Sequence, residues 1–251
     1  MRQIAIIGAT SAIAQACARE WAARGDRLLL VGRDAARLEE IAQDLRVRSG
    51  SAGNQAAITS FVMDATDTAR IEELLAFARD RDIAIDAALV AYGTLPDQAQ
   101  CEASLELTLR AVEVNGTSVI AWMAALGQLF AQKGGGTLAV IGSPAGDRGR
   151  ASNYTYGAAK SMVHTFAQGL RHRLWRQGVR VLLLKPGFVD TPMTRGFDKK
   201  GPLWSSAAVV ARGIVDAIDR ADGTVYVPGF WRYIMLVIRH LPWFVFRRMS
   251  I

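Results

Sequence analysis

The stretch Gln3-Ile-Ala-Ile-Ile-Gly8-Ala-Thr-Ser-Ala-Ile-Ala14 decides the fold of this chain. Its first residues form an apolar run, which is typical of a strand covered on both faces of a parallel sheet. Gly8 ends the run, and small residues then open a helical pattern. A tight turn here can bring backbone N–H groups to a phosphate at the helix N-terminus. An ordinary strand-to-helix turn is the alternative interpretation of the same residues.

The alternation of strand and helix continues along the chain. We expect strands over Ile4–Gly8, Arg27–Gly32, Ala57–Met63, Asp86–Tyr92, Gly136–Gly142, Val179–Leu184 and Gly223–Val227. Helical patterns lie between them, over Ala12–Arg24, Ala35–Arg48, Thr68–Arg81, Asn115–Gln132, Asn153–Gln177 and Ser205–Arg220. Repeated units of this kind predict an α/β fold, namely a doubly wound, seven-stranded parallel sheet of Rossmann type with helices on both faces.

The length and composition favour a single domain. Residues 1–229 are predicted to form the Rossmann-type domain, and residues 230–251 a basic amphipathic tail of the same domain. Residues 49–54 are interpreted as a loop between elements rather than a domain boundary. The formal net charge of the chain is +7, and the tail contributes four arginines and no acid. The basic character is therefore largely a property of the C-terminus and does not indicate a nucleic-acid-binding body.

Cysteine content and hydropathy favour a cytoplasmic protein. Cys17 and Cys101 are isolated, without the spacing of metal ligands or of a disulfide framework. No metal site is predicted. The first strand is too short and wrongly flanked for a signal peptide, and no stretch approaches 18 uninterrupted apolar residues. We therefore expect no transmembrane helix.

The end of the second expected strand bears on cofactor choice. The chain reads Val31-Gly32-Arg33-Asp34, where an acid would bind the ribose 2′-hydroxyl of NAD. Arg33 instead supplies a forked cation for a 2′-phosphate. Asp34 is better interpreted as the N-cap of the next helix. These residues favour NADP over NAD, the alternative being that Arg33 is a solvated loop charge.

Four residues predict the chemistry. Tyr156 and Lys160 are four residues apart, so that a helix places them on one face, one turn apart. A nearby cation favours the phenolate and lowers the pKa of a tyrosine. Such a tyrosine can exchange a proton with a carbonyl or alcohol oxygen. Ser143 and Asn115 complete the set, although Ser143 alone is also compatible with a turn after a strand.

In this combination the chain resembles the short-chain dehydrogenase/reductase family over essentially its whole length. The glycine motif of the family corresponds to Gly8–Ala14, with alanines at its second and third glycine positions. Its Asn-Ala-Gly segment corresponds to Ala91-Tyr92-Gly93, where the Asn is lost. The resemblance assigns catalysis to Asn115, Ser143, Tyr156 and Lys160. It assigns cofactor binding to Gly8, Thr10, Ser11, Ala12, Ile13, Arg33, Asp64, Ala91, Gly93, Tyr156, Lys160, Pro186, Gly187, Val189 and Thr191.

The resemblance implies a mechanism for ketone reduction. Tyr156 would donate a proton to the developing alkoxide while Ser143 hydrogen-bonds the same oxygen. Lys160 would lower the pKa of Tyr156 and bind the nicotinamide ribose. Asn115 would hold a water chain that supplies protons. NADPH would carry the hydride. The family also implies a homodimer or a homotetramer.

The C-terminal tail is the second unusual segment. It mixes bulky apolar and aromatic residues with arginine, and Pro242 is expected to divide it into two short helices. Such a segment suits an anchor on anionic lipid, or alternatively a packing surface between subunits. The loop 192–206 is expected to close over the substrate, where Arg195, Lys199 and Lys200 can meet an anion or remain solvated.

Within the family, the tail and the Ala91-Tyr92-Gly93 segment are similar to those of decaprenylphosphoryl-2-keto-β-D-erythro-pentose reductases. This similarity implies reduction of the keto group of a polyprenyl-phosphate-linked sugar, beside an oxidase that makes the ketone, with the protein peripheral at the inner face of the membrane. Reduction of a lipid ketone, of 3-ketosphinganine or β-ketoacyl type, is an alternative. A non-catalytic dinucleotide-binding protein is another, but it has no need of Tyr156.

Overall fold

A parallel sheet of seven strands forms the centre of the protein. The structure is a computed structural model of the 251-residue chain, and it describes residues 1–50, 58–199 and 201–249. The strand order is β3-β2-β1-β4-β5-β6-β9. The strands are β1 (Gln3–Ile7), β2 (Arg27–Gly32), β3 (Ile58–Val62), β4 (Ala87–Val90), β5 (Gly136–Ile141), β6 (Val179–Pro186) and β9 (Gly223–Val227). The predicted doubly wound, single-domain Rossmann fold is thereby confirmed.

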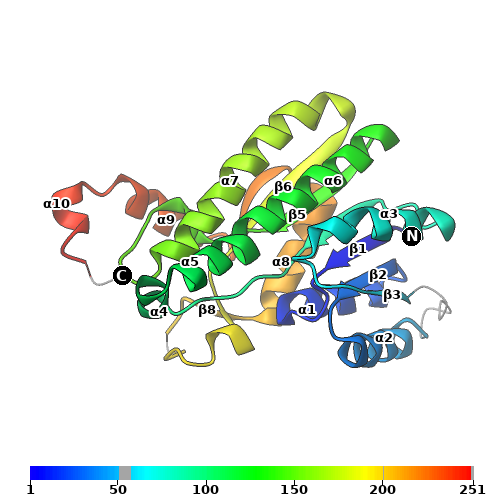
Figure 1. The fold of residues 1–251 in the computed structure, drawn as a ribbon, viewed down its shortest axis with the longest axis horizontal. Coiled ribbons are helices and arrows are strands. Elements are labelled where there is room, and N and C mark those ends of the chain that lie inside the picture. Colours follow the sequence, from blue (N-terminus) through cyan, green and yellow to red (C-terminus); the bar gives the residue numbers. More distant parts are fainter. Residues whose placement is uncertain (51–57, 200, 250–251) are drawn as a thin grey trace.

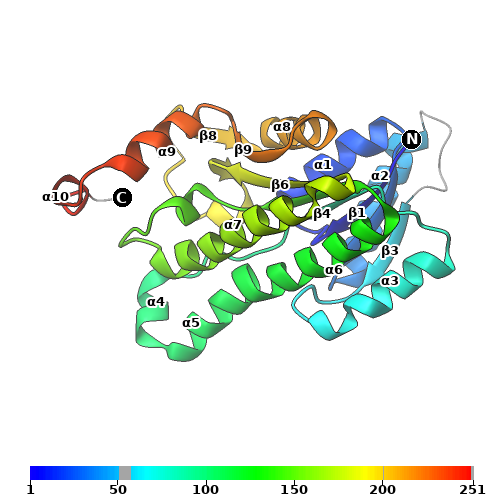
Figure 2. The same ribbon diagram turned by 90° about the horizontal axis from the view of Figure 1, so that it is seen from above.

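Helices cover both faces of this sheet (Figure 1 and Figure 2). One short parallel pair, β7 (Phe188–Asp190) and β8 (Trp204–Ser206), lies outside it. The α-helices are α1 (Ala12–Ala23), α2 (Ala35–Gly50), α3 (Ile71–Asp80), α4 (Gln98–Ala103), α5 (Leu105–Val112), α6 (Ser118–Lys133), α7 (Tyr154–Leu174), α8 (Ala207–Arg220), α9 (Trp231–His240) and α10 (Trp243–Phe246). The 3-10 turns are η2 (Thr68–Arg70), η4 (Pro144–Asp147), η5 (Trp175–Gln177) and η6 (Pro192–Thr194).

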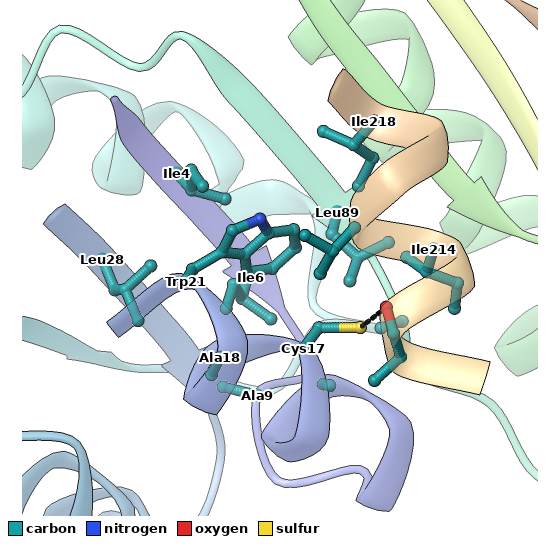
Figure 3. Close-up of a cluster of buried hydrophobic side chains, with 14 of the residues drawn as sticks. Ile4, Ile6, Ala9, Cys17, Ala18, Trp21, Leu28, Leu89, Ile214 and Ile218 are labelled. Atoms are coloured by element: carbon teal, nitrogen blue, oxygen red, sulfur yellow. Dashed lines mark hydrogen bonds between the residues drawn. The ribbon is translucent and has the colours of Figure 1, made fainter. Parts of the chain in front are cut away.

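Two apolar cores lie on the two faces of the sheet. Successive strand residues alternate between them, so that Ile4 and Ile6 of β1 belong to one core and Ala5 and Ile7 to the other. The first core receives α1, α2 and α8, and Figure 3 shows Trp21 of α1 packed among its aliphatic side chains. The second receives α3, α6 and α7. Double coverage explains why the strands are apolar at consecutive positions.

Cys17 lies inside the first core. Its Sγ faces the carbonyl oxygen of Ala211 at 4.0 Å, and burial raises the pKa of its thiol (Figure 3). Cys101 is also buried, and both cysteines are free. Their role is therefore packing, as expected for buried thiols in apolar surroundings.

The helix that carries Asn115 begins earlier than the sequence predicts. The expected helix Asn115–Gln132 is preceded by α4 and α5, and a π-helical turn over Glu113–Thr117 joins α5 to α6. Leu105, Leu107 and Leu109 alternate with polar residues and are exposed, which hides the helical period in this segment. The resulting run Leu105–Lys133 is long and apolar enough to span a membrane by length and composition, contrary to expectation, but half of its most apolar window is buried in the protein.

Two further expectations concern loops and ends. α2 continues through Ser49 and Gly50, so the predicted loop is wrong at those two positions; residues 51–54 of that loop, and Ala57 of the expected third strand, lie outside the described residues. Ser49 is buried and its hydroxyl donates to the carbonyl of Arg46, which ties it to the last helical turn. The division of the tail at Pro242 is confirmed, because this proline separates α9 from α10.

The strand order indicates where on the sheet a ligand is expected to bind. It reverses between β1 and β4, and ligands of open α/β sheets bind beyond the carboxyl ends of the strands at such a point. In Figure 1 and Figure 2 the N-terminus lies at the opposite end of the molecule from α9 and α10. The C-terminal helices are therefore at the end toward which the parallel strands run.

Candidate active site

The predicted site residues follow the carboxyl ends of successive strands. Gly8 comes after β1, Arg33 after β2 and Asp64 after β3; Ala91 comes after β4 and Ser143 after β5. Because all of these strands are parallel, their ends meet at one edge of the sheet. The topology thus brings together residues that are far apart in the chain.

The first turn leaves little space between its backbone and the next strand end. Gly8 has a φ of 85°, and a Cβ added there would lie 2.6 Å from the Cβ of Tyr92. Only glycine adopts this conformation without strain in so narrow a space. The Ser11 side chain caps α1 by accepting from the Ala14 N–H at 3.2 Å. This turn holds the N-terminus of α1 against the end of β4.

The remaining residues of this turn suit a phosphate. Thr10 presents its carbonyl to Gln15 at 2.8 Å, and Ala12 and Ile13 form the first turn of α1. Ala12 and Ala14 stand where the family has glycines, and Ala14 is buried in the first core. A helix N-terminus with small flanking residues favours an anionic group.

Arg33 is an exposed cation at this edge. Its side chain is 76% exposed, and its Nη1 lies 3.4 Å from Oδ2 of Asp64. Asp64 is fixed by the N–H and the hydroxyl of Thr66, both at 2.8 Å. These hydrogen bonds, together with Arg33, lower the pKa of Asp64. Asp34 accepts from the Arg37 N–H at 3.0 Å and so caps α2, as predicted.

Asn115 is completely buried where the π-helical turn interrupts the helix. Its Nδ2 donates to the carbonyl of Ala111 at 3.0 Å, and its Oδ1 accepts from the N–H of Thr94 at 3.0 Å. A Cβ added to Gly93 would lie 2.8 Å from that Oδ1. Asn115 therefore ties the segment after β4 to the helix, and it fits only because position 93 has no side chain.

Lys160 lies deep in the same region. Its Nζ donates to the carbonyl of Ile141 at 3.0 Å and lies 5.7 Å from the ring centroid of Tyr156. Desolvation lowers the pKa of Lys160 to about 8. The lysine is held by β5 and directed along the face that carries Tyr156.

Tyr156 has a higher pKa than expected. Burial raises the pKa of this half-buried phenol to about 12, although a hydrogen bond with the Ser143 side chain opposes the shift. The expected lowering of this pKa by Lys160 is not found: desolvation of the phenolate dominates, and the only opposing cause is the Ser143 side chain. The phenol is therefore neutral near pH 7, which is the form that donates a proton.

Ser143 begins the turn that follows β5. Its Oγ accepts from the Ala145 N–H at 3.1 Å, which fixes the serine as the N-cap of η4. Ser143 is also the hydrogen-bond partner of Tyr156. The two hydroxyl groups thus lie together and can both contact one substrate oxygen.

The segment after β6 completes the predicted set. Pro186 ends β6, and Val189 is buried in β7. The Thr191 N–H donates to Oγ1 of Thr194 at 3.2 Å, which folds the chain back at this point. A Cβ added to Gly187 would lie 1.8 Å from Nε1 of Trp231 in α9. The segment that follows β6 and the C-terminal tail are therefore in direct contact.

A buried polar cluster beside Ser143 was missed at the sequence level. Asp147 of η4 accepts from Lys185 of β6 and, at 2.6 Å, from the hydroxyl of Tyr226 in β9. His164 of α7 places Nδ1 3.6 Å from the same carboxylate and accepts from the Ser143 N–H through Nε2 at 3.4 Å. Burial lowers the pKa of His164 to about 3. The cluster joins η4, α7, β6 and β9 beside Ser143, and no local motif signals it.

Metal coordination has no candidate here. Across residues 1–50, 58–199 and 201–249, no group of three or more His, Cys, Asp or Glu side chains is placed to hold a metal ion.

The comparisons with known proteins agree with this geometry. The short chain dehydrogenase family model matches residues 2–201. The chain is 34% identical to an uncharacterized oxidoreductase of Streptomyces coelicolor, over 100% of this chain and 96% of the relative. It is 33% identical to an uncharacterized oxidoreductase of Mycobacterium tuberculosis, over 98% of this chain and 96% of the relative. The chain belongs to the short-chain dehydrogenase family, and it is an oxidoreductase.

Solved structures share the fold. A variant of actinorhodin polyketide ketoreductase with NADPH superposes with a TM-score of 0.76 at 24% identity, covering 91% of this chain and 96% of that chain. Levodione reductase superposes with a TM-score of 0.81 at 22% identity, covering 92% of this chain and 98% of that chain.

Proposed function

We propose that this protein is an NADPH-dependent ketoreductase. The observation that carries the proposal is the pairing of the Tyr156 and Ser143 hydroxyl groups, with the buried Lys160 Nζ 5.7 Å from the Tyr156 ring centroid on the same helix face. A tyrosine hydroxyl placed beside a serine hydroxyl can give a proton to a developing alkoxide, which is the proton transfer that reduction of a ketone requires. The reaction class follows from these three residues.

The residues of the site have separate tasks. Tyr156 donates its proton to the substrate oxygen, and Ser143 hydrogen-bonds the same oxygen as charge develops there. Lys160 would hold the ribose hydroxyls of the cofactor, and Asn115 keeps the segment after β4 in place. When bound, the dihydronicotinamide supplies the hydride to the carbonyl carbon.

The residues present fit a nicotinamide dinucleotide, and they favour the phosphorylated form. The narrow turn at Gly8 leads to the N-terminus of α1, which suits the pyrophosphate. Arg33 is an exposed guanidinium where an acid would select NAD, and it can pair with a 2′-phosphate. NADPH is therefore the proposed cofactor.

The proposed substrate is the keto group of a polyprenyl-phosphate-linked sugar. Three features support it: the similarity of the tail to that of keto-pentose reductases, the position of the tail at the active-site end, and an exposed Arg195 in the loop after η6. Lys199 is paired with Asp190, and Lys200 lies outside the described residues. A substrate of this kind implies a partner oxidase that supplies the ketone, and an enzyme at the cytoplasmic face of the membrane. The homodimer or homotetramer expected from the family belongs to the same proposal.

The test of the reaction is NADPH oxidation by the full-length protein with a panel of ketones. We expect turnover with a lipid-linked keto-sugar and little with 3-ketosphinganine or a β-ketoacyl thioester. Turnover of acyl ketones alone would replace the sugar by a lipid ketone. Cofactor binding without turnover of any ketone would identify a non-catalytic dinucleotide-binding protein.

The matched variants are Tyr156→Phe and Tyr154→Phe. Tyr154 is exposed at the start of α7, its hydroxyl donates to Glu102 at 3.0 Å, and the residue four positions after it is Ala158 rather than a lysine. Tyr156→Phe should keep NADPH binding and lose turnover by roughly 100-fold or more, the usual scale for a general acid. Tyr154→Phe should keep both. Unimpaired turnover of Tyr156→Phe would overturn the assignment.

A further inference from the structure

The tail helices α9 and α10 form a surface at the active-site end of the molecule. Figure 1 and Figure 2 both show them projecting at the end opposite the N-terminus, where the parallel strands finish. Helices α4 and α5 lie toward the same end in both views. Any partner of this surface would therefore be close to the site of the reaction.

The inner side of the tail is packed against the protein. Trp231, Met235 and Phe246 are buried, and the Trp231 ring meets Phe188 of β7 edge-on at 5.0 Å. The Arg148 guanidinium donates hydrogen bonds to the carbonyl oxygens of Ile238 and Leu241 and so holds the end of α9. The tail is therefore an ordered part of the protein, and its remaining side chains are presented to the surroundings in a fixed arrangement.

The outer side is apolar and aromatic. Tyr233 is 70% exposed, Trp243 69% and Phe244 61%. Between and beside them the tail exposes further bulky apolar residues, namely Phe230, Leu236, Val237, Val245 and Met249. This much apolar and aromatic exposure on two consecutive short helices marks an interaction surface.

The charge of the surface selects its partner. Arg232, Arg239, Arg247 and Arg248 are exposed there, residues 230–251 contain no acid, and none of the described tail residues forms a salt bridge. Self-pairing of two copies about a two-fold axis would place the same tail surface on both sides, so the arginines of each copy would meet a tail that contains no acidic side chain. Anionic lipid supplies the counter-charge, and its headgroup layer accommodates tryptophan, tyrosine and arginine together.

We infer that α9 and α10 dock the protein on an anionic bilayer and hold the active-site end at the membrane surface. This inference rests on the proposed function, because a polyprenyl-linked ketone resides in that layer. The exposed aromatic side chains enter the interface, and the arginines contact lipid phosphates. The active site then faces the source of its substrate.

The experiment is vesicle sedimentation of the full-length protein, with phosphatidylcholine vesicles that contain or lack phosphatidylglycerol. We expect binding to the anionic vesicles, weakened by salt, and little binding to phosphatidylcholine alone. Trp243→Ser/Phe244→Ser should abolish it, and Arg247→Gln/Arg248→Gln should weaken it on the order of 30-fold. The matched control is Trp175→Ser/Arg176→Gln, an exposed tryptophan and arginine directly after α7, which should bind like the parent.

The outcomes separate this inference from the proposed function. Absence of binding to anionic vesicles, or unchanged binding by both tail variants, would overturn it. A loss of oligomer mass in those variants by light scattering, with no vesicle binding by the parent, would assign the surface to a second copy instead. Turnover of a water-soluble ketone should be unchanged in the tail variants. Failure of the ketoreductase proposal would abolish turnover in every variant while leaving vesicle binding intact.

Discussion

The guanidinium of Arg148 donates a hydrogen bond of 2.7 Å to the carbonyl oxygen of Leu241, the C-cap residue that follows α9. It also donates to the carbonyl of Ile238 and lies 3.7 Å from the ring centroid of Phe246. The last carbonyls of a helix have no partner within it, and here a side chain from the loop after η4 supplies one. The loop that begins at Ser143 and the C-terminal tail are therefore one structural unit.

Substitution of Arg148 should separate the C-terminal tail from the loop that begins at Ser143. Arg148→Met keeps the aliphatic stem but removes two charge-assisted hydrogen bonds, so we expect a loss of about 2 to 4 kcal/mol in the free energy of unfolding. Hydrogen exchange should rise over α9 and α10, and kcat should fall. The control is Arg173→Met, because Arg173 is exposed and donates only to Gln128. Unchanged exchange in α9 would contradict the coupling.

His164 should position Ser143 without contacting substrate. Its neutral ring accepts from the Ser143 N–H, so the ring proton lies on Nδ1, toward Asp147. His164→Phe keeps the ring volume and removes the acceptor. We expect kcat to fall roughly 10- to 100-fold through misplacement of the serine, with the Kd for NADPH unchanged within about twofold.

Two comparisons distinguish positioning by His164 from a general loss of folding. His164→Gln provides a side-chain carbonyl that can accept the same hydrogen bond, so it should recover part of kcat. His172→Phe alters an exposed histidine of the same helix and should behave like the parent. Equal loss of kcat and NADPH affinity in His164→Phe would show that the histidine only supports the fold.

Most of the fold can be predicted from local sequence pattern. The strands can be recognised in the sequence because a sheet with helices on both faces requires consecutive apolar residues, as in Leu28–Val31. The division of the tail into two helices can be predicted because Pro242 cannot continue a helix. Helix α5 is not recognisable from the sequence, since Leu105, Leu107 and Leu109 are exposed and their alternation with polar residues also fits a strand. An element whose apolar residues face a partner or solvent gives no core pattern to detect.

The residues of the candidate site likewise include some that local sequence pattern predicts and some that it does not. Tyr156 and Lys160 are recognisable because they share a helix at fixed spacing. The cluster of Asp147, His164 and Lys185 is not, because its members come from three elements that meet only in the folded chain. The pKa of Tyr156 cannot be predicted from the sequence either, because it depends on how far the folded protein desolvates the phenol.

Arg33 should determine the preference for NADPH. Arg33→Ala removes the exposed cation beside Asp64, so we expect the Kd for NADPH to rise roughly 10- to 100-fold, as for loss of a hydrogen bond to a charged group. The Kd for NADH should stay within about twofold. The control is Arg46→Ala on α2, where the arginine pairs with Glu39. A parallel loss of both cofactors would mean that Arg33 supports the turn and does not read the phosphate.

Lys160 should reduce stability at neutral pH in exchange for its role in the site. Burial lowers its pKa from 10.5 to about 8, so the unfolded chain holds this proton more tightly than the folded protein does. Stability is therefore lowest below pH 8 for this group and rises as the pH increases from about 8 to 10.5. The shift corresponds to about 3 kcal/mol below pH 8, since one pKa unit is about 1.4 kcal/mol.

The sign of this linkage can be read from the variant Lys160→Met. At pH 7 and without cofactor, the variant escapes the cost of the buried charge but loses the hydrogen bond to the Ile141 carbonyl, worth about 1 kcal/mol. We expect it to be more stable than the parent by about 2 kcal/mol in urea denaturation. Near pH 11 the order should reverse, because the parent lysine is then neutral in the fold and largely neutral in the unfolded chain, while the lost hydrogen bond remains. A variant less stable than the parent at both pH values would show that Lys160 is held by interactions that outweigh its desolvation.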